Sequence, residues 1–133
     1  EMPTWDMSAA WPGGFIASAE VRRLAPAPGR STAWVRTGVG LVAGETASSA
    51  ARAIGLLDIA NGLAVRAEPS AVAFPNIDLT AHLFAEPRGE WLGFDTSVSF
   101  GQDGLGLTHS IIHDETGPIG SSAQMLTVRP TTV

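Results

Sequence analysis

A single helix constrains what this chain can fold into more than any other feature of its sequence. The run from Glu45 to Leu63 ends in Asn61-Gly62, a pair typical of helix C-termini. At 100° per residue its polar side chains gather on one side, and nearly all other positions are Ala, Ile, Leu or Gly. Asp58 and Asn61 are the exceptions, and both project from the side opposite the polar cluster. We therefore expect one largely apolar helix packed closely inside a sheet.

Strand candidates lie on both sides of this helix. Residues 15–24 and residues 32–42 precede it, and the second of these alternates between two faces as a strand does. Four candidates follow the helix, separated by turn formers, at residues 74–84, 91–100, 105–113 and 119–128. This order predicts an α+β fold in which one antiparallel sheet packs its apolar face on one helix.

Length and composition bound the domain organisation and the class of protein. We expect one domain at residues 15–130, with residues 1–14 as a linker or N-terminal extension and residues 131–133 as a tail. The formal net charge of −5 argues against nucleic acid as a partner. The absence of Cys excludes thiolate chemistry. No apolar run reaches the roughly 20 residues that span a bilayer and no signal peptide opens the chain, so we expect no membrane partner and a cytoplasmic location.

Two segments carry a resemblance to a known family. Residues 77–92 read IDLTAHLFAEPRGEWL, and residues 114–124 read DETGPIGSSAQ. These segments resemble the family of acyl-CoA thioesterase II. The first contains a strand Asp, an aromatic and His-containing stretch, a Pro, a turn and Glu90-Trp91-Leu92. The second is a hairpin that leads to a Gln. That family builds its enzyme from two hot-dog halves in one chain. The resemblance covers about residues 32–130 and implies the C-terminal half, a hot-dog fold with a long central helix wrapped by a curled antiparallel sheet.

The resemblance also implies three catalytic residues. The family's Asp sits late in the central helix, which matches Asp58, and its Gln matches Gln124. Its Ser or Thr lies two residues before the strand Asp, which places it at Asn76. An amide in place of the hydroxyl departs from the family pattern. Asn76 also shares strand parity with Asp78 and Thr80, which puts it on the outward polar face.

The residues themselves favour Asp58 as the reactive group. A carboxylate near a helix C-terminus, on the side that should face the interior, is costly unless hydrogen-bond donors meet it. We expect it to face an enclosed cavity within reach of Gln124, which is in phase with the apolar face of the last strand. It could then act as a general base that activates water, with Gln124 holding the water and the carboxylate, and Asn76 assisting or donating to the oxyanion. The alternative is a structural carboxylate that caps backbone N–H groups, and for Gln124 an amide satisfied by neighbouring backbone.

Other reactive side chains fit known sites less well. His109 and His113 share one strand face but lie roughly 13 Å apart, too far to bind one metal ion together. No serine sits in a Gly-x-Ser-x-Gly elbow. The glycines of residues 38–44 fail the dinucleotide and phosphate-loop spacings.

The resemblance implies hydrolysis of a fatty or related acyl-CoA thioester to free acid and coenzyme A, with no metal or organic cofactor. The expected partners are the acyl-CoA substrate and a second hot-dog domain, from the same or another chain, as in a dimer. The alternative is a non-catalytic acyl-binding or structural hot-dog half. A hydratase of this fold ranks last, because no His lies within residues 44–63.

Overall fold

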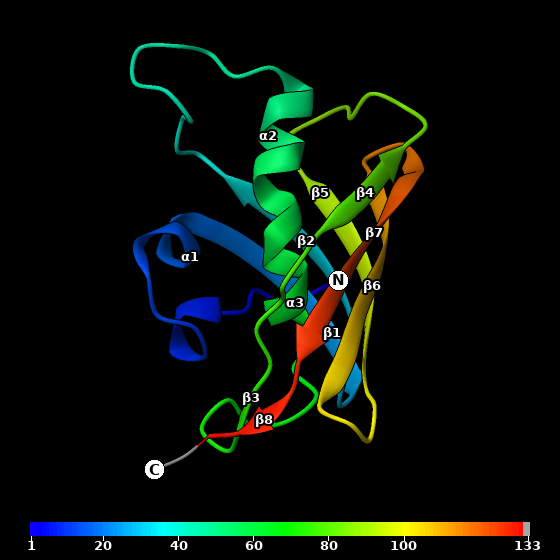
Figure 1. The fold of residues 1–133 in the computed structure, drawn as a ribbon. Helices are drawn as coiled ribbons and strands as arrows, with labels where there is room; N and C mark the ends of the chain where they lie inside the picture. The colour runs from blue at the N-terminus through cyan, green and yellow to red at the C-terminus, as the bar shows by residue number, and fades with distance from the viewer. Residues whose placement is uncertain (132–133) are drawn as a thin grey trace.

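The computed structural model describes residues 1–131, so the predicted tail lies outside the described residues from 132 onwards. A six-stranded antiparallel sheet and one helix against its face form an α+β fold (Figure 1), as predicted. The sheet has the strand order β1-β2-β5-β6-β7-β4, which places β4, the first of its strands after the helix, at an edge. Its strands are β1 (Ala19–Ala27), β2 (Arg30–Thr37), β4 (Thr80–Leu83), β5 (Leu92–Phe100), β6 (Leu105–Asp114) and β7 (Gly117–Thr127).

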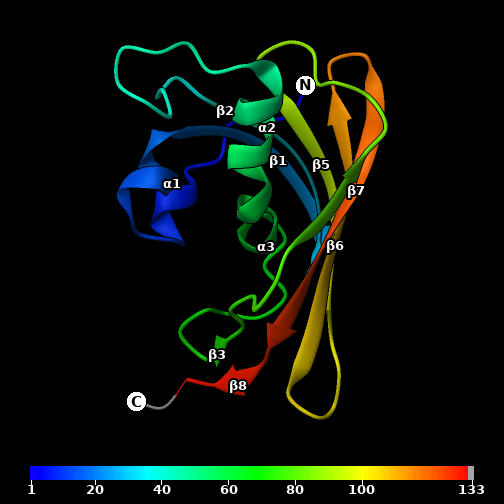
Figure 2. The ribbon, with the colours of Figure 1, turned by 45° about the horizontal axis from the view of Figure 1, so that its top comes forward.

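The central helix comprises α2 (Ser49–Leu56), a 3-10 turn η2 (Leu57–Ile59) and α3 (Ala60–Leu63). It begins four residues after the predicted Glu45, because the Ser48 side chain accepts a hydrogen bond from the Ala51 N–H at 3.1 Å and caps the first turn. Residues 38–48 instead form a loop that extends beside the helix (Figure 2). No helix in the described part of the chain is long and apolar enough to cross a membrane.

The strands after the helix were easier to predict than those before it. β5, β6 and β7 lie within two residues of their predicted bounds. The predicted strand at residues 15–24 is instead a short helix, α1 (Gly14–Ser18), followed by β1. The predicted strand at residues 74–84 contains only β4, and a separate two-stranded sheet pairs β3 (Val72–Ala73) with β8 (Arg129–Pro130).

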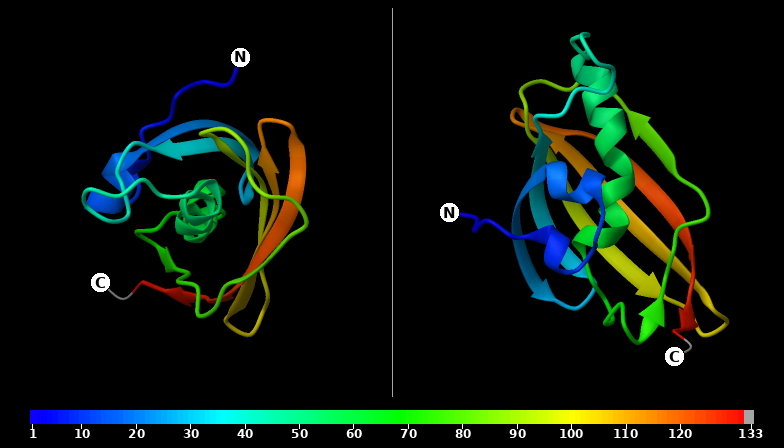
Figure 3. Two further views of the ribbon diagram at one scale, coloured as in Figure 1. Left: turned by 90° about the horizontal axis from the view of Figure 1, so that it is seen from above. Right: turned by 90° about the vertical axis from the view of Figure 1, so that its left-hand side faces the viewer.

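The N-terminal residues expected to form a linker pack onto the domain. The segment contains a 3-10 turn, η1 (Met7–Ala9), and Met7 is only 3% exposed within the core. Trp11 Nε1 donates to the Gly62 carbonyl at 3.0 Å, which ties the segment to the end of the helix. The Trp5 N–H donates to the Val21 carbonyl at 2.8 Å along the outer side of β1. The segment with η1 and α1 therefore lies on the side of the helix away from β4, and it protects the β1 edge (Figures 1 and 3).

The core beneath the helix changes character across the sheet. Apolar side chains of β2, β5 and β6 meet the buried face of the helix, among them Val35, Phe94 and Ile112. Farther along the inner face of β6 and β7 the buried side chains become polar, and they include Thr108, Ser110, Ser122 and Gln124. Buried polar groups need partners, so this side of the core is where specific hydrogen bonds to the helix are expected.

An irregularity separates β4 from the segment that precedes it. Thr80 pairs with Ala123 in the ladder between β4 and β7, while Asn76 forms an isolated bridge with Leu126. The pairing has shifted by one residue between these two points, as in a β-bulge, and such a shift exchanges the two faces. The Asp78 carboxylate bridges the irregular stretch by accepting the Met125 N–H at 2.8 Å.

Candidate active site

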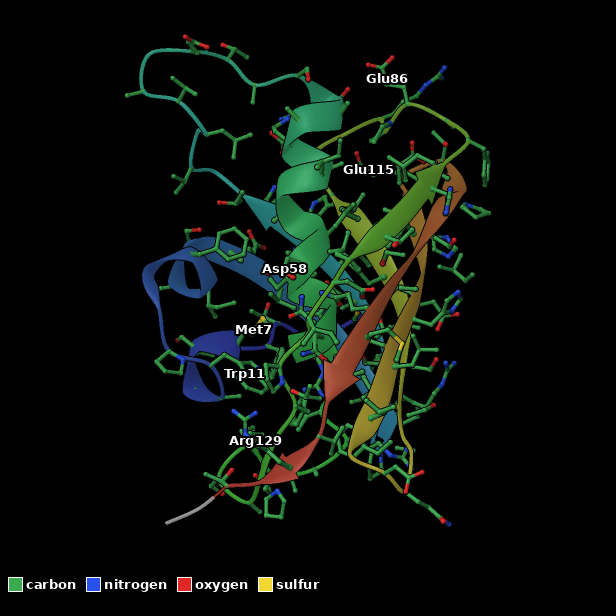
Figure 4. The ribbon with its side chains drawn as sticks, viewed as in Figure 1. Met7, Trp11, Asp58, Glu86, Glu115 and Arg129 are labelled. Carbon is green, nitrogen blue, oxygen red and sulfur yellow. The ribbon has the colours of Figure 1, made fainter. Side chains whose placement is uncertain are left out.

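Two amide side chains that are distant in the sequence converge on one oxygen of the Asp58 carboxylate. Gln124 Nε2 on β7 donates to Asp58 Oδ1 at 2.9 Å, and Asn76 Nδ2 donates to the same oxygen at 3.0 Å. Asp58 lies in η2, where the helix tightens before α3 (Figure 4). The structure thus brings together all three residues that the sequence and the family resemblance singled out.

Asp58 is not enclosed within this chain. The residue is exposed, so the expectation of a carboxylate facing an enclosed cavity is wrong for the chain by itself. Its exposure follows from the helix, whose neighbouring turn on the same side carries Ile54, 60% exposed. Both amide contacts go to Oδ1, and residues 1–131 supply no hydrogen bond to Oδ2. One oxygen is therefore held in place while the other is open to solvent.

Gln124 is held deep under the helix. It is 1% exposed and stands opposite Thr108 in the ladder of β6 and β7. Its Nε2 also lies 3.5 Å from the Asp58 backbone carbonyl, so the amide nitrogen is directed at Asp58 alone. Its Oε1 is buried and has no partner within the described residues. A buried acceptor without a donor costs about 1–3 kcal/mol, so the contact with Asp58 is made at the expense of stability.

Asn76 faces the helix and not the outward polar face that its parity predicted. The bulge before β4 reverses the faces, and the bridge to Leu126, a core residue, places Asn76 on the inner side. Its Nδ2 contacts Asp58 Oδ1 and, at 3.4 Å, the Asp78 carbonyl. An amide nitrogen has two N–H groups, and both are engaged here. Asn76 therefore contacts the carboxylate with one N–H, and its second N–H is directed at the Asp78 carbonyl.

Two residues that the sequence did not assign to the site extend this cluster. Asn61 Nδ2 donates to the Phe74 carbonyl at 2.9 Å, and Thr108 Oγ1 donates to Asn61 Oδ1 at 2.8 Å. Asn61 was visible as the second polar residue on the apolar side of the helix. Nothing in the sequence marked Thr108, because a single Thr in a strand is ordinary.

Two other residues of the segments that resemble the family, Trp91 and Asp114, make contacts that hold the fold together. Trp91 packs against two guanidinium groups, with the Arg36 Cζ 4.5 Å and the Arg22 Cζ 5.1 Å from its ring. The Asp114 carboxylate accepts the Thr116 N–H at 2.7 Å and the Arg88 N–H at 2.9 Å, so it joins the last hairpin to the loop after β4. Thr116 also donates its hydroxyl to this carboxylate, which holds the pKa of Asp114 below its ordinary value against the effect of burial.

The three histidines lie on two strands of the sheet. His109 and His113 lie on β6, paired across the sheet with Ser97 and Gly93, and His82 lies on β4. Within residues 1–131 no three His, Asp or Glu side chains gather in a group that could hold a metal ion.

An apolar hollow of about 330 Å³ lies beside the same helix. Its walls come from α1, from the segment after β2 and from α2, and they include Phe15, Val39, Leu41 and Gly55. Phe15, Val39 and Leu41 are each 48–63% exposed, which leaves an apolar surface open to a ligand or partner. Gly55 and Asp58 are three residues apart and occupy adjacent turns of the helix surface.

A single helix packed on an antiparallel sheet, with the first sheet strand after the helix at the edge, defines the hot-dog class of domain, and solved structures agree. Acyl-CoA thioesterase II TesB2 from Mycobacterium marinum aligns over 98% of this chain and 56% of its own, with a TM-score of 0.62 and 21% identity. A hot-dog protein of unknown function from Alicyclobacillus acidocaldarius aligns over 98% and 52%, with a TM-score of 0.69 and 11% identity. A putative thioesterase II from Thermobifida fusca aligns over 87% and 47%, with a TM-score of 0.61 and 20% identity.

The sequence also matches the family profile described as the acyl-CoA thioesterase C-terminal domain, over residues 1–128. The chain therefore belongs to that family, as the resemblance predicted. It spans about half the length of the two thioesterase II structures named above. No curated protein sequence gives a significant match.

Proposed function

We propose that this chain is the half of an acyl-CoA thioesterase that carries the catalytic carboxylate, and that Asp58 activates the water that hydrolyses a fatty or related acyl-CoA. Membership of the thioesterase family supports the class of reaction. The observation that carries the proposal is the convergence of two amide nitrogens, 2.9 and 3.0 Å away, on one oxygen of Asp58. A carboxylate fixed through Oδ1 presents Oδ2 in a defined direction, which is what a general base needs.

In the proposed reaction a water molecule donates a hydrogen bond to Asp58 Oδ2 and attacks the thioester carbonyl. Its proton passes to Oδ2 as the C–O bond forms and the carbonyl oxygen becomes an oxyanion. The intermediate then expels the coenzyme A sulfur, which takes the proton from Asp58, and the free acid remains. Gln124 and Asn76 orient the carboxylate throughout. Because the Asn76 nitrogen already donates to Asp58 and to the Asp78 carbonyl, we expect the oxyanion donor to come from backbone or from a second domain.

The exposure of Asp58 is consistent with a site completed by a second hot-dog domain. β4 is a sheet edge, and its unpaired backbone groups are suited to pairing with another strand. Ile77, Leu79 and Phe84 lie before, beside and after it and are 65%, 37% and 77% exposed. A domain paired along this edge would cover these side chains and limit the access of water to Asp58. Such burial strengthens the electrostatic interactions of the carboxylate with the reacting atoms.

The apolar hollow between α1 and α2 supports an acyl substrate. Of its polar lining residues Ser18, Thr37 and Arg52, the two hydroxyls are bonded to nearby chain, with Ser18 Oγ donating to the Phe15 carbonyl at 2.7 Å and Thr37 Oγ1 to the Ser18 carbonyl at 3.2 Å. The Arg52 guanidinium is the one charged group in the lining. The surface left for a ligand is therefore mainly apolar. We place part of the acyl chain there, with the thioester carbonyl near Asp58 on the adjacent helical turn.

The proposal is tested by Asp58→Asn. The Asn oxygen can still accept from both amides, so we expect the melting temperature to change little, whereas kcat falls by roughly 10²–10⁴-fold because the general base is lost. Free-thiol release from a panel of acyl-CoA substrates measures the activity, with the chain alone and with a second hot-dog domain supplied. Unchanged turnover by the Asn variant would remove Asp58 from the mechanism.

A non-catalytic acyl-binding half is the second candidate, and the amide at Asn76 favours it. A hydroxyl is the family's usual group at that position, and its replacement is consistent with a site that has lost activity. Thermal stabilisation by acyl-CoA, without thiol release under any pairing with a second domain, would select this reading.

A further inference from the structure

We infer that Asn61, held by Thr108, is a positioning residue. It sets the distance between residues 74–77, the segment that contains Asn76, and the helix that carries Asp58. The inference rests on the proposed function, because it names residues that act through Asn76 on the reaction of Asp58. It is carried by a continuous set of contacts, from Thr108 to Asn61 and from Asn61 to the Phe74 carbonyl, two residues before Asn76.

The orientation of the Asn61 side chain is fixed by its two partners. The Phe74 carbonyl can only accept, so Nδ2 must face it, and the Thr108 hydroxyl must then donate to Oδ1. Thr108 is 1% exposed and lies on the inner face of β6. Without its hydroxyl, Asn61 Oδ1 would lose its donor, and the amide could rotate away from Phe74.

The segment that carries Asn76 is held from two directions. β7 holds it within the sheet, because the Thr127 N–H donates to the Pro75 carbonyl at 3.1 Å and the Ile77 N–H to the Met125 carbonyl at 2.8 Å. These bonds lie in the plane of the sheet, so they do not fix the distance between the segment and the helix that packs on the sheet. The bond from Asn61 to Phe74 runs from the helix to the segment and supplies that constraint.

Asn61 and Asp58 lie one turn apart in the same helix, so both contacts with the segment start from one rigid element. Asn61 reaches the segment at Phe74, and Asp58 is met by Asn76 at 3.0 Å. A change in the first contact therefore alters the length or angle of the second. Phe74 itself is 4% exposed and packs against Trp11 and Phe100, which keeps its carbonyl in a stable place.

The test compares Thr108→Val with Thr96→Val. Both threonines lie on the inner face of the sheet at 0–1% exposure, and each makes a single side-chain hydrogen bond, Thr96 to the Ser110 hydroxyl at 2.8 Å. We expect similar losses of stability from the two variants. Only Thr108→Val should lower kcat, by roughly 10–100-fold with KM little changed, because a misplacement of about 1 Å can cost about 10²-fold in rate. Thr108→Ser keeps the hydroxyl and should retain wild-type kcat.

A double-mutant cycle separates positioning from general destabilisation. In an Asn76→Ala background Thr108→Val should have no further effect on kcat, while its effect on stability persists. Asn61→Ala should reproduce the kcat effect of Thr108→Val if that variant folds poorly. Equal loss of kcat in the Thr108→Val and Thr96→Val variants, or additive effects of Thr108→Val and Asn76→Ala, would overturn the inference.

A readout that needs no turnover distinguishes this inference from the proposed function. The side-chain amide signal of Asn76 in NMR spectra should shift in Thr108→Val and stay in place in Thr96→Val. Absence of hydrolysis by the wild-type protein would refute the proposed function and leave the NMR comparison valid. If the Asn76 amide signal has the same chemical shift in Thr108→Val as in the wild-type protein, the positioning role is overturned, whatever activity the variant has.

Discussion

Gln124 combines a contact to the candidate catalytic carboxylate with a buried carbonyl that lacks a partner within the described residues. The Gln124 side chain is 1% exposed, its Nε2 is 2.9 Å from Asp58 Oδ1, and its Oε1 has no partner within residues 1–131. Most buried polar atoms in proteins have a hydrogen-bond partner, so a buried carbonyl without one is unfavourable for stability. The amide nitrogen is directed at Asp58, at its carboxylate and, at 3.5 Å, at its backbone carbonyl, so a catalytic role and a structural role of Gln124 have to be separated by substitution.

Gln124→Met separates these two effects. Met has a similar length and adapts to irregular packing, and it removes both the donor to Asp58 and the unmatched Oε1. We expect the free energy of unfolding to stay constant or to rise by up to about 1–3 kcal/mol, while hydrolysis of acyl-CoA falls. Urea unfolding and thiol release measure the two quantities, with Ser122→Ala as a control on the same buried face of β7. Stability and activity that fall together would assign Gln124 to the fold alone.

The hairpin between β6 and β7 carries a pH dependence that is separate from the site. The pKa of Asp114 is lowered by the Thr116 hydroxyl, so its stabilising effect is fully present above the unfolded pKa of about 3.9 and is lost as pH falls through the lower folded pKa. We expect Asp114→Asn to be less stable than wild type at neutral pH. The difference in free energy of unfolding should shrink below about pH 4, as the wild-type carboxylate takes up its proton. A difference that stays constant from neutral to acid pH would contradict this assignment.

The central helix allows a test of the acyl-chain site. Gly55 lines the apolar hollow, and an added Cβ there would meet only the Leu41 side chain, with Cδ2 3.4 Å away, so we expect a larger side chain at this position to occupy part of the hollow. We expect Gly55→Leu to lower kcat/KM for long acyl chains by roughly tenfold or more, relative to short ones. Gly55→Ala controls for the gain in helix propensity of about 1 kcal/mol. An unchanged chain-length profile would place the acyl chain elsewhere.

Elements with a regular alternation of apolar and polar residues could be predicted from the sequence, and elements where this alternation is interrupted could not. β5, β6 and β7 alternate regularly and are joined by short turns, so their bounds and the α+β class follow from the sequence. The start of the helix did not follow, because Ser48 rather than the Gly44-Glu45 pair forms the cap. The inward position of Asn76 did not follow either. Parity counts assume an unbroken ladder, and the bulge bridged by Asp78 breaks it.

At the scale of the whole molecule, the exposure of Asp58 is the feature that the helix pattern could not predict. The helical wheel places Asp58 opposite the polar cluster and so predicts burial, but Asp58 is exposed while Leu57 and Leu63 of the same helix are buried. Apolar and small residues on a helix do not reveal whether the surface that covers them belongs to the same chain. Ile54, one turn before Asp58, is exposed as well, at 60%.

If a second domain pairs along β4, we expect association with that domain and hydrolysis of acyl-CoA to depend on the same residues. If a second hot-dog domain covers the β4 edge and Asp58, substitution of Leu79 and Phe84 by Glu should weaken association measured by sedimentation velocity and lower hydrolysis in parallel. The free energy of unfolding of the isolated chain should change little, because these side chains are already 37% and 77% exposed. By mass action, the activity of the unsubstituted domain should rise with partner concentration, while that of the double variant should stay low.

The outer face of the sheet offers the matched control. Leu105 and Leu107 on β6 are 50% and 40% exposed, so Glu substitutions there add the same charge to a comparable apolar surface away from the β4 edge. This control should associate and hydrolyse normally. If it loses association while the variant at Leu79 and Phe84 keeps it, the partner binds the outer face. Asp58 would then have to work in an open, hydrated position, where a carboxylate interacts only weakly with the reacting atoms.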